Sequence, residues 1–178
     1  MANLMEKPLT DHLKAFILPM FMLVVLPAGI NLLEYRLFSK PVVTNQIPLL
    51  LTGAVVGLAG GALLAASIRL IIVQANTTIM PWDPSEKLVV SGPYSYVRNP
   101  MILGVILVMA AEGLILESYG ILGMALLFFL GNTVYFILSE EPHLAQRFGE
   151  EYQAYRRHVR RWLPRTTSWK PEEIDRDP

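Results

Sequence analysis

The chain has 178 residues, of which 53% are hydrophobic and only 17% are charged, an imbalance that is unusual for a soluble globular domain. Its net charge is zero, so the composition gives no reason to expect a nucleic-acid partner. Cysteine is absent, which excludes disulfides, thiolate metal ligands and cysteine nucleophiles, and we predict no metal site.

Four apolar stretches predict membrane spans, because a helix needs about 20 mostly apolar residues to cross the hydrocarbon core of a bilayer. They are residues 15–33, 47–74, 100–116 and 119–139. The first is long for a signal peptide, and we expect a retained span. Only Glu117 and Ser118 separate the last two, which predicts a tight antiparallel hairpin. The predicted fold is therefore all-α: a single polytopic membrane domain with about four transmembrane helices, followed by a cytosolic C-terminal helix.

A repeat of small residues marks the second span. Gly53, Gly57 and Gly61 recur at every fourth position and so lie near one another on a helix face. Such a face allows the backbones of two membrane helices to approach closely. We interpret these glycines as a packing surface rather than as part of a ligand site.

The basic residues predict the orientation. With four spans, the N-terminus, the 75–99 connection and the tail from residue 140 share one side of the membrane. Most lysines and arginines of the connecting segments lie on that side, whereas the other side has only Arg36 and Lys40. The positive-inside rule therefore places both termini and the 75–99 connection in the cytosol. In the tail we expect a helix over residues 141–159, Trp162 at the membrane interface and a loosely held final dozen residues.

The end of the 75–99 connection has the pattern of a helix start. Gly92-Pro93 is a turn signal. In Arg98-Asn99-Pro100, asparagine is a favourable N-cap and proline fits the first helical position. The span that begins there presents free backbone N–H groups, which could bind a carboxylate or hydroxyl of a ligand. An ordinary capped helix with interfacial tyrosines explains the pattern equally well.

Two adjacent carboxylates, Glu140 and Glu141, follow the fourth span directly. Carboxylates at the end of a membrane helix are costly unless they are solvated or paired. Glu140 could accept hydrogen bonds from the sugar hydroxyls of a ligand or pair with Arg98, and a solvated helix terminus is the simpler alternative. Tyr152 and Tyr155 share one face of the expected helix, where packing is the more common role.

In this order and spacing, the motifs resemble the isoprenylcysteine carboxyl methyltransferases and the wider group that includes the phospholipid N-methyltransferases. The pattern of that group is Gly-x-Tyr, then Arg-His-Pro or Arg-Asn-Pro at a helix start, an acidic pair after the next helix, Phe-Gly-x-x-Tyr-x-x-Tyr and a closing Leu-Pro. This chain has Gly92-Pro93-Tyr94, Arg98-Asn99-Pro100, Glu140-Glu141, residues 148–155 and Leu163-Pro164. The resemblance covers about the C-terminal half of the chain.

The resemblance implies an enzyme that uses S-adenosylmethionine as methyl donor in a cytosol-facing pocket. The implied donor-binding residues are Lys87, Leu88, Val89, Tyr94, Asn99, Pro100, Met101, Ile102 and Glu140. Arg98 and Glu141 are the candidate catalytic residues, with Arg98 orienting an anionic acceptor or the acidic pair. Asn99 stands where many relatives have histidine, and Ile102 where many have tyrosine. Since asparagine carries no proton near neutral pH, the first departure argues against a base at this position.

An acceptor that reaches such a site from the bilayer should be an amphiphile among the membrane lipids. A prenylcysteine carboxylate, a phospholipid amine and other lipophilic nucleophiles all fit. Two other classes of protein stay open. Membrane sterol reductases that use NADPH share a similar C-terminal pattern, although they usually have more spans, and a non-catalytic membrane scaffold would use the same polar residues only as a rim.

Overall fold

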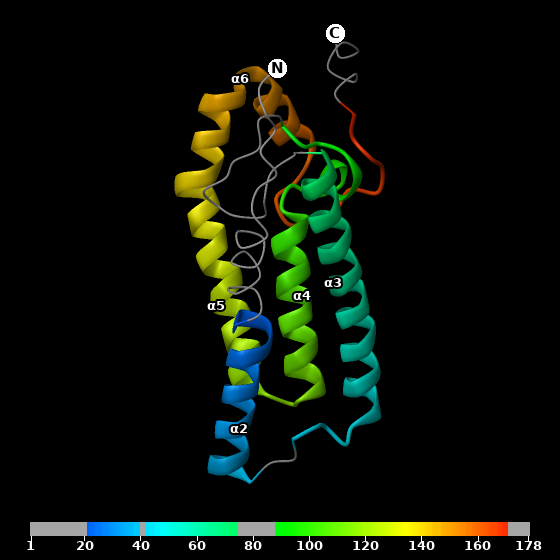
Figure 1. The fold of residues 1–178 in the computed structure, drawn as a ribbon, viewed down its shortest axis with the longest axis vertical. Coiled ribbons are helices and arrows are strands. Elements are labelled where there is room, and N and C mark those ends of the chain that lie inside the picture. Colours follow the sequence, from blue (N-terminus) through cyan, green and yellow to red (C-terminus); the bar gives the residue numbers. More distant parts are fainter. Residues whose placement is uncertain (1–20, 40–41, 75–87, 171–178) are drawn as a thin grey trace, which may run out of the picture.

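The computed structural model describes residues 21–39, 42–74 and 88–170 (Figure 1). Its α-helices are α2 (Leu26–Phe38), α3 (Ile47–Gln74), α4 (Pro100–Ile115), α5 (Tyr119–Tyr135) and α6 (Glu141–His158). Single π-helical turns precede α2, at Phe21–Val25, and join α5 to α6, at Phe136–Glu140, and a 3₁₀ turn spans Gly92–Ser95. No β-strand occurs in these ranges, so the predicted all-α fold is confirmed. Residues 15–20 of the first predicted span and the predicted site residue Lys87 lie outside the described residues.

Three helical stretches are long and apolar enough to cross a membrane: Phe21–Phe38, Ile47–Ile71 and Tyr119–His158, which comprises α5, a π-helical turn and α6. The fourth apolar helix, α4, has 16 residues, a length of about 24 Å against a hydrocarbon core of about 30 Å. Large apolar side chains on α2, α3 and α5 are exposed on the surface of the bundle. Contact with lipid accounts for apolar surface of this extent, and the chain is a polytopic membrane protein.

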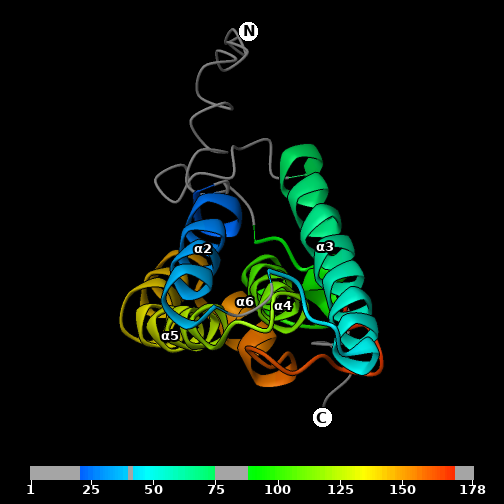
Figure 2. The same cartoon turned by 90° about the horizontal axis from the view of Figure 1, so that it is seen from below.

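Seen along their axes, the helices form a curved row in the order α2, α5, α4, α3 (Figure 2). Contacts join α2 to α5, α5 to α4 and, most extensively, α4 to α3. The short helix α4 is therefore flanked on two sides, and its residues Val105 and Met109 form a buried core with Ala125 of α5. The loop of residues 88–99, α6 and the chain that follows α6 gather at one end of the row, which we call the α6 end (Figure 1).

Small residues bring the backbones of α3 and α4 together, as the glycine repeat predicts. A Cβ atom added at Gly53 would lie 2.6 Å from a side-chain carbon of α4, and one added at Gly60 would lie 2.7 Å from the Leu107 Cβ. In return, a Cβ atom added at Gly104 would lie 2.9 Å from the Gly60 carbonyl oxygen. The prediction was wrong for Gly61, where an added Cβ meets nothing within 4 Å. Gly60 takes its place because it follows Gly53 by seven residues, which is nearly two full helical turns, so both glycines face α4. Gly61 follows Gly53 by eight residues and is rotated past that face.

Polar contacts close the end of the bundle opposite the α6 end. The Ser118 hydroxyl accepts a hydrogen bond at 3.1 Å from a backbone N–H in the first turn of α5, and Glu117 has a φ of 47°. This tight turn confirms the predicted hairpin between α4 and α5. The Thr44 hydroxyl donates to Glu117 at 2.9 Å, and the Gly120 N–H donates to Glu34 at 2.8 Å. The hairpin is thereby tied to the end of α2 and to the start of α3.

The predicted C-terminal helix is interrupted. Gly149 has φ 54° and ψ −128° inside α6, a backbone conformation that glycine adopts readily because it has no Cβ. At this kink the chain turns back over the α6 end (Figure 1). The helix predicted over residues 141–159 is therefore confirmed as α6, apart from this kink, and the reversal brings the second half of α6 to the 88–99 loop.

The contact between α3 and α4 predicts opposite outcomes for two neighbouring substitutions. Gly60→Ala places a methyl group 3.0 Å from the carbonyl oxygen of Gly104 and the backbone nitrogen of Val108, neither of which can rotate away. We expect a loss of about 1–3 kcal/mol in the free energy of unfolding. Gly61→Ala meets open space and is the matched control. Thermal unfolding of both variants in detergent provides the measurement, and equal melting temperatures would contradict this account of the contact.

Candidate functional site

The chain after α6 folds back on the 88–99 loop, and we call residues 159–169 the C-terminal clasp. Three backbone hydrogen bonds join the two segments. They run from the Arg98 N–H to the Arg160 carbonyl (3.0 Å), from the Arg165 N–H to the Tyr96 carbonyl (2.9 Å) and from the Trp169 N–H to the Ser95 carbonyl (3.0 Å). Trp169 is only 1% exposed. The expectation that the final dozen residues are loosely held was therefore wrong at this residue, because its large ring is buried in the fold.

An aromatic core lies between α6, the clasp and the 88–99 loop. It consists of the buried residues Tyr152, Ala154, Tyr155, Val159 and Trp169, with Leu88 and Val90 packed against them. The Tyr155 hydroxyl donates to the Tyr94 carbonyl at 2.7 Å, and the ring centroids of Tyr155 and Trp169 are 5.6 Å apart. The packing role expected for Tyr152 and Tyr155 is confirmed. The hydrogen bond also fixes the backbone of Tyr94, a predicted donor-binding residue.

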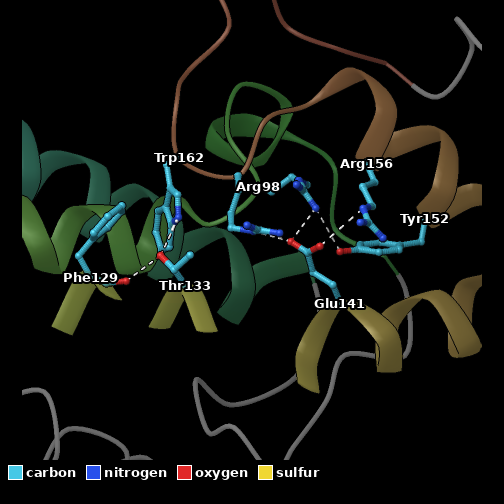
Figure 3. A network of polar contacts seen from close by, with 8 residues as sticks. Arg98, Phe129, Thr133, Glu141, Tyr152, Arg156 and Trp162 are labelled. Atoms are coloured by element: carbon cyan, nitrogen blue, oxygen red, sulfur yellow. Dashed lines mark hydrogen bonds and ion pairs between the residues drawn. The ribbon is translucent and has the colours of Figure 1, made fainter. Parts of the chain in front are cut away.

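Glu141, the first residue of α6, is buried and receives three guanidinium groups (Figure 3). Arg98 Nη1 donates to Glu141 Oε1 at 2.8 Å. Arg161 Nε donates to the same oxygen at 2.7 Å, and Arg156 Nε lies 3.6 Å from Oε2. The Tyr152 hydroxyl accepts a longer contact from Arg98, at 3.5 Å. The 88–99 loop, the second half of α6 and the clasp thus meet at one carboxylate.

The arginines determine the ionisation of Glu141. Burial alone would raise its pKa, but the hydrogen bond from Arg161 and the charges of Arg98, Arg161 and Arg156 outweigh burial and hold the pKa below its ordinary value. Glu141 is therefore ionised at neutral pH. Of the two glutamates that could have paired with Arg98, the structure chooses Glu141. Both of its oxygens are engaged, which suits a group that holds segments in place, and the catalytic role of Glu141 stays a prediction.

Glu140 faces a different environment, because successive helical residues point about 100° apart. It is the last residue of the π-helical turn, is half-buried, and has no hydrogen-bond or ion-pair partner among the described residues. Burial, with the charge of Glu141 as a smaller cause, raises its pKa to about 7. Burial also raises the pKa of Tyr94, and the charge of Glu140 adds to that effect. The two residues, 46 positions apart in the chain, are therefore near enough to interact electrostatically.

The predicted start of α4 is confirmed, with one difference. Asn99 is the N-cap residue and Pro100 the first helical residue, and the Asn99 carbonyl accepts the Leu103 N–H at 3.0 Å. The Asn99 side chain, however, makes no capping hydrogen bond. Pro100 is buried, and Met101 and Ile102 are half-buried. The first N–H groups of α4 thus lack a side-chain cap and are available to an acceptor from outside the helix.

The remaining predicted residues lie close by. Leu88 packs on the aromatic core, and Val89, next to it, is half-buried. The Arg98 side chain is 10% exposed, and its Nε is buried without a hydrogen-bond partner in the described part of the chain. The structure therefore pairs Arg98 with Glu141 and places Tyr94 near enough to Glu140 for an electrostatic interaction. The first turn of α4 begins two residues after Arg98.

Sequence reasoning missed several residues that build this region. Arg156 and Arg161 contributed to the prediction only as positive charges that indicate the cytosolic side. A signal was present, because a carboxyl pair at the end of a span needs cationic partners and these arginines follow it closely in the sequence. Trp162 was expected at the membrane interface. Its Nε1 donates to the Thr133 hydroxyl at 3.1 Å, and its ring lies 5.2 Å from that of Phe129 (Figure 3). The clasp therefore packs against the last turns of α5 through Trp162.

A search of protein families decides the wider relationship. The family described as phospholipid methyltransferase (PEMT) matches residues 49–151, which is more than half of the 178 residues. The chain belongs to the phospholipid methyltransferase family. The matched part of the chain runs from the start of α3 into α6 and includes Arg98, Glu140 and Glu141. No curated protein and no solved structure matches the chain.

Membership in the phospholipid methyltransferase family supports a membrane methyltransferase that acts on lipid substrates. This agrees with the apolar helices and with the resemblance that the motifs indicate. The family match ends at residue 151, so all five buried residues of the aromatic core, two of the three arginines around Glu141 and the whole clasp lie beyond it.

The two neighbouring glutamates should respond differently to loss of charge. Glu141→Gln leaves three guanidinium groups without their shared carboxylate, and we expect a loss of about 3–5 kcal/mol in the free energy of unfolding, as for other broken buried pairs. Glu140→Gln removes a carboxylate whose charged form the fold disfavours, so its stability should stay within about 0.5 kcal/mol of wild type. Thermal and denaturant unfolding in detergent measure the stability of both variants against wild type. Equal destabilisation by both substitutions would disprove the division of roles.

Proposed function

We propose that the chain transfers a methyl group from S-adenosylmethionine to a lipophilic acceptor. The observation that carries this proposal is the environment of Glu140, a half-buried carboxylate that has no partner among the described residues and that interacts electrostatically with Tyr94. It adjoins Glu141, whose partner Arg98 lies two residues before α4, and the start of α4 has no side-chain cap. A free carboxylate and free backbone N–H groups within one polar region suit a ligand that carries both signs of charge.

The donor has such a character, since its amino-acid end carries an ammonium and a carboxylate and its sugar carries hydroxyls. Glu140 would accept hydrogen bonds from the ammonium or the ribose hydroxyls. The N–H groups of Met101 and Ile102, at the positive end of the α4 dipole, would bind the carboxylate. Tyr94 would line the site, and residues 87–89 would contribute mainly through their backbone.

When bound, S-adenosylmethionine supplies a methyl group activated by the positive charge on its sulfur. The transfer would be an in-line displacement, in which a lone pair of the acceptor would form the new bond to the methyl carbon. The electron pair of the broken S–CH₃ bond would stay on the sulfur, which would leave as a neutral thioether. The protein's tasks are alignment and exclusion of water, and alignment alone can lower a barrier by about 7–11 kcal/mol. A carboxylate acceptor needs no base, whereas an ammonium must first release a proton to solvent or to a base.

Arg98 is the residue we propose to orient the acceptor. Its guanidinium is held by Glu141 through Nη1, while its buried Nε has no described partner. A guanidinium held in this way can donate to a phosphate or carboxylate. The family favours a phospholipid amine as acceptor, and a prenylcysteine carboxylate carries an anion that would serve equally well. The many arginines at the α6 end support a cytosolic position for this site.

Binding and transfer assays on the detergent-solubilised chain test the proposal. Isothermal titration should show binding of S-adenosylmethionine and none of NADPH. The reverse result would support a sterol-type reductase, and binding of neither would support a non-catalytic scaffold. Transfer of a radiolabelled methyl group to fractionated membrane lipids and to a prenylcysteine analogue identifies the acceptor. Donor binding without transfer to any of these would contradict a methyltransferase of this substrate range.

Donor affinity should depend on pH through Glu140. Its pKa is about 7 without donor, and the ionised form is the one that would bind an ammonium. Affinity should therefore hold above pH 7 and fall by up to about tenfold for each pH unit below it. Glu140→Gln should bind donor weakly and with little pH dependence. Titrations from about pH 5 to about pH 9 measure both, and wild-type affinity in the variant would exclude Glu140 from the site.

A further inference from the structure

The C-terminal clasp contacts the neighbours of two residues that we assign to the donor site, although it lies beyond residues 49–151, which match the family. On one side, Arg161 donates to Glu141 at 2.7 Å, and Glu141 adjoins Glu140. On the other side, Trp169 packs against Tyr155, whose hydroxyl donates to the Tyr94 carbonyl at 2.7 Å. One segment is thus connected, through a single intermediate residue on each side, to Glu140 and to Tyr94.

These connections are unlike ordinary surface contacts. Glu141 is 4% exposed, and it draws its charge compensation from residues that meet only in the folded state. Tyr155 is 3% exposed and Trp169 is 1% exposed, and their rings, with that of His158 stacked on Trp169 at a centroid distance of 5.8 Å, leave little room for independent movement. Because interiors pack closely, displacement of the clasp would be transmitted to the residues that it holds.

We infer that the C-terminal clasp is a positioning element of the donor site, in which Arg161 orients Glu140 through Glu141 and Trp169 orients Tyr94 through Tyr155. Neither Arg161 nor Trp169 touches the donor in this arrangement. The inference rests on the proposed function, because it assigns Glu140 and Tyr94 to the donor. It adds two positioning residues that the motifs do not contain, and it makes a folded C-terminus a condition for donor binding.

The charges around Glu140 allow a positioning role to be distinguished from simple destabilisation, through the pH dependence of donor binding. Glu140 faces the charge of Glu141 on its own helix and interacts with Tyr94 from the loop, while Arg98, Arg156 and Arg161 neutralise Glu141. Removal of one guanidinium leaves more of the negative charge on Glu141 unbalanced. The pH at which the donor affinity is half lost should then move upward.

The decisive experiment compares donor binding by the full chain in detergent, with S-adenosylmethionine as the probe. Arg161→Gln should move the pH midpoint upward by about one unit, because the less compensated charge of Glu141 keeps more of Glu140 protonated. Donor binding near neutral pH should therefore weaken by up to about tenfold. Arg161→Lys, which keeps the charge, should restore the midpoint. Arg157→Gln removes an exposed arginine of α6 and is the matched control, with affinity and midpoint expected to equal those of wild type.

Tyr155→Phe tests the second connection without emptying the aromatic core, because it removes only the hydroxyl that donates to Tyr94. It should weaken donor binding while the melting temperature changes little, and it keeps the inference testable if Arg161→Gln does not fold. Wild-type affinity in Tyr155→Phe, or wild-type affinity and midpoint in a folded Arg161→Gln, would overturn the inference. Absence of donor binding by the wild-type chain would instead overturn the proposed function.

Discussion

The α6 end of this protein depends on the neutralisation of one buried carboxylate. Removing an ionised carboxylate from water costs several kcal/mol unless charges and hydrogen bonds offset it. At Glu141 the offset comes from Arg98, Arg156 and Arg161, which belong to three different segments. Each segment supplies one of the three guanidinium groups, so the compensation of this charge is shared among them. The 88–99 loop, the reversed half of α6 and the clasp must therefore come together, and this requirement couples their folding.

The membrane helices provide the rigid frame for that assembly. Glycines at the contact between α3 and α4 allow the two backbones to approach to a distance that any larger residue would prevent. The hairpin after α4, capped by Ser118, fixes α5 beside it. Because α4 and α5 are anchored at the opposite end, the start of α4 and the end of α5 reach the α6 end in a defined register. Two adjacent glutamates there have different surroundings: Glu141 pairs with arginines, and Glu140 interacts electrostatically with Tyr94.

This arrangement explains how a small chain can combine a polar site with a lipid environment. The residues proposed for the donor gather where the apolar helices end, and the sides of those helices expose apolar residues suited to lipid. A lipid acceptor would then approach along the bundle and the donor from the water. Membership in the phospholipid methyltransferase family supports a lipid substrate, and the proposed arrangement would admit one.

The sequence by itself determined the features that follow from local rules. The length of the apolar stretches gave the all-α membrane class, the two-residue gap gave the hairpin, and Arg98-Asn99-Pro100 gave the start of α4. It also marked the residues of the candidate site, because the motifs are local patterns. Only the tertiary structure decided that Arg98 pairs with Glu141 rather than Glu140, that Gly60 rather than Gly61 meets α4, and that Trp169 is buried. These depend on which face of a helix meets which neighbour and on the reversal at Gly149. Both are set by packing and charge compensation between segments far apart in the chain, which no local pattern contains.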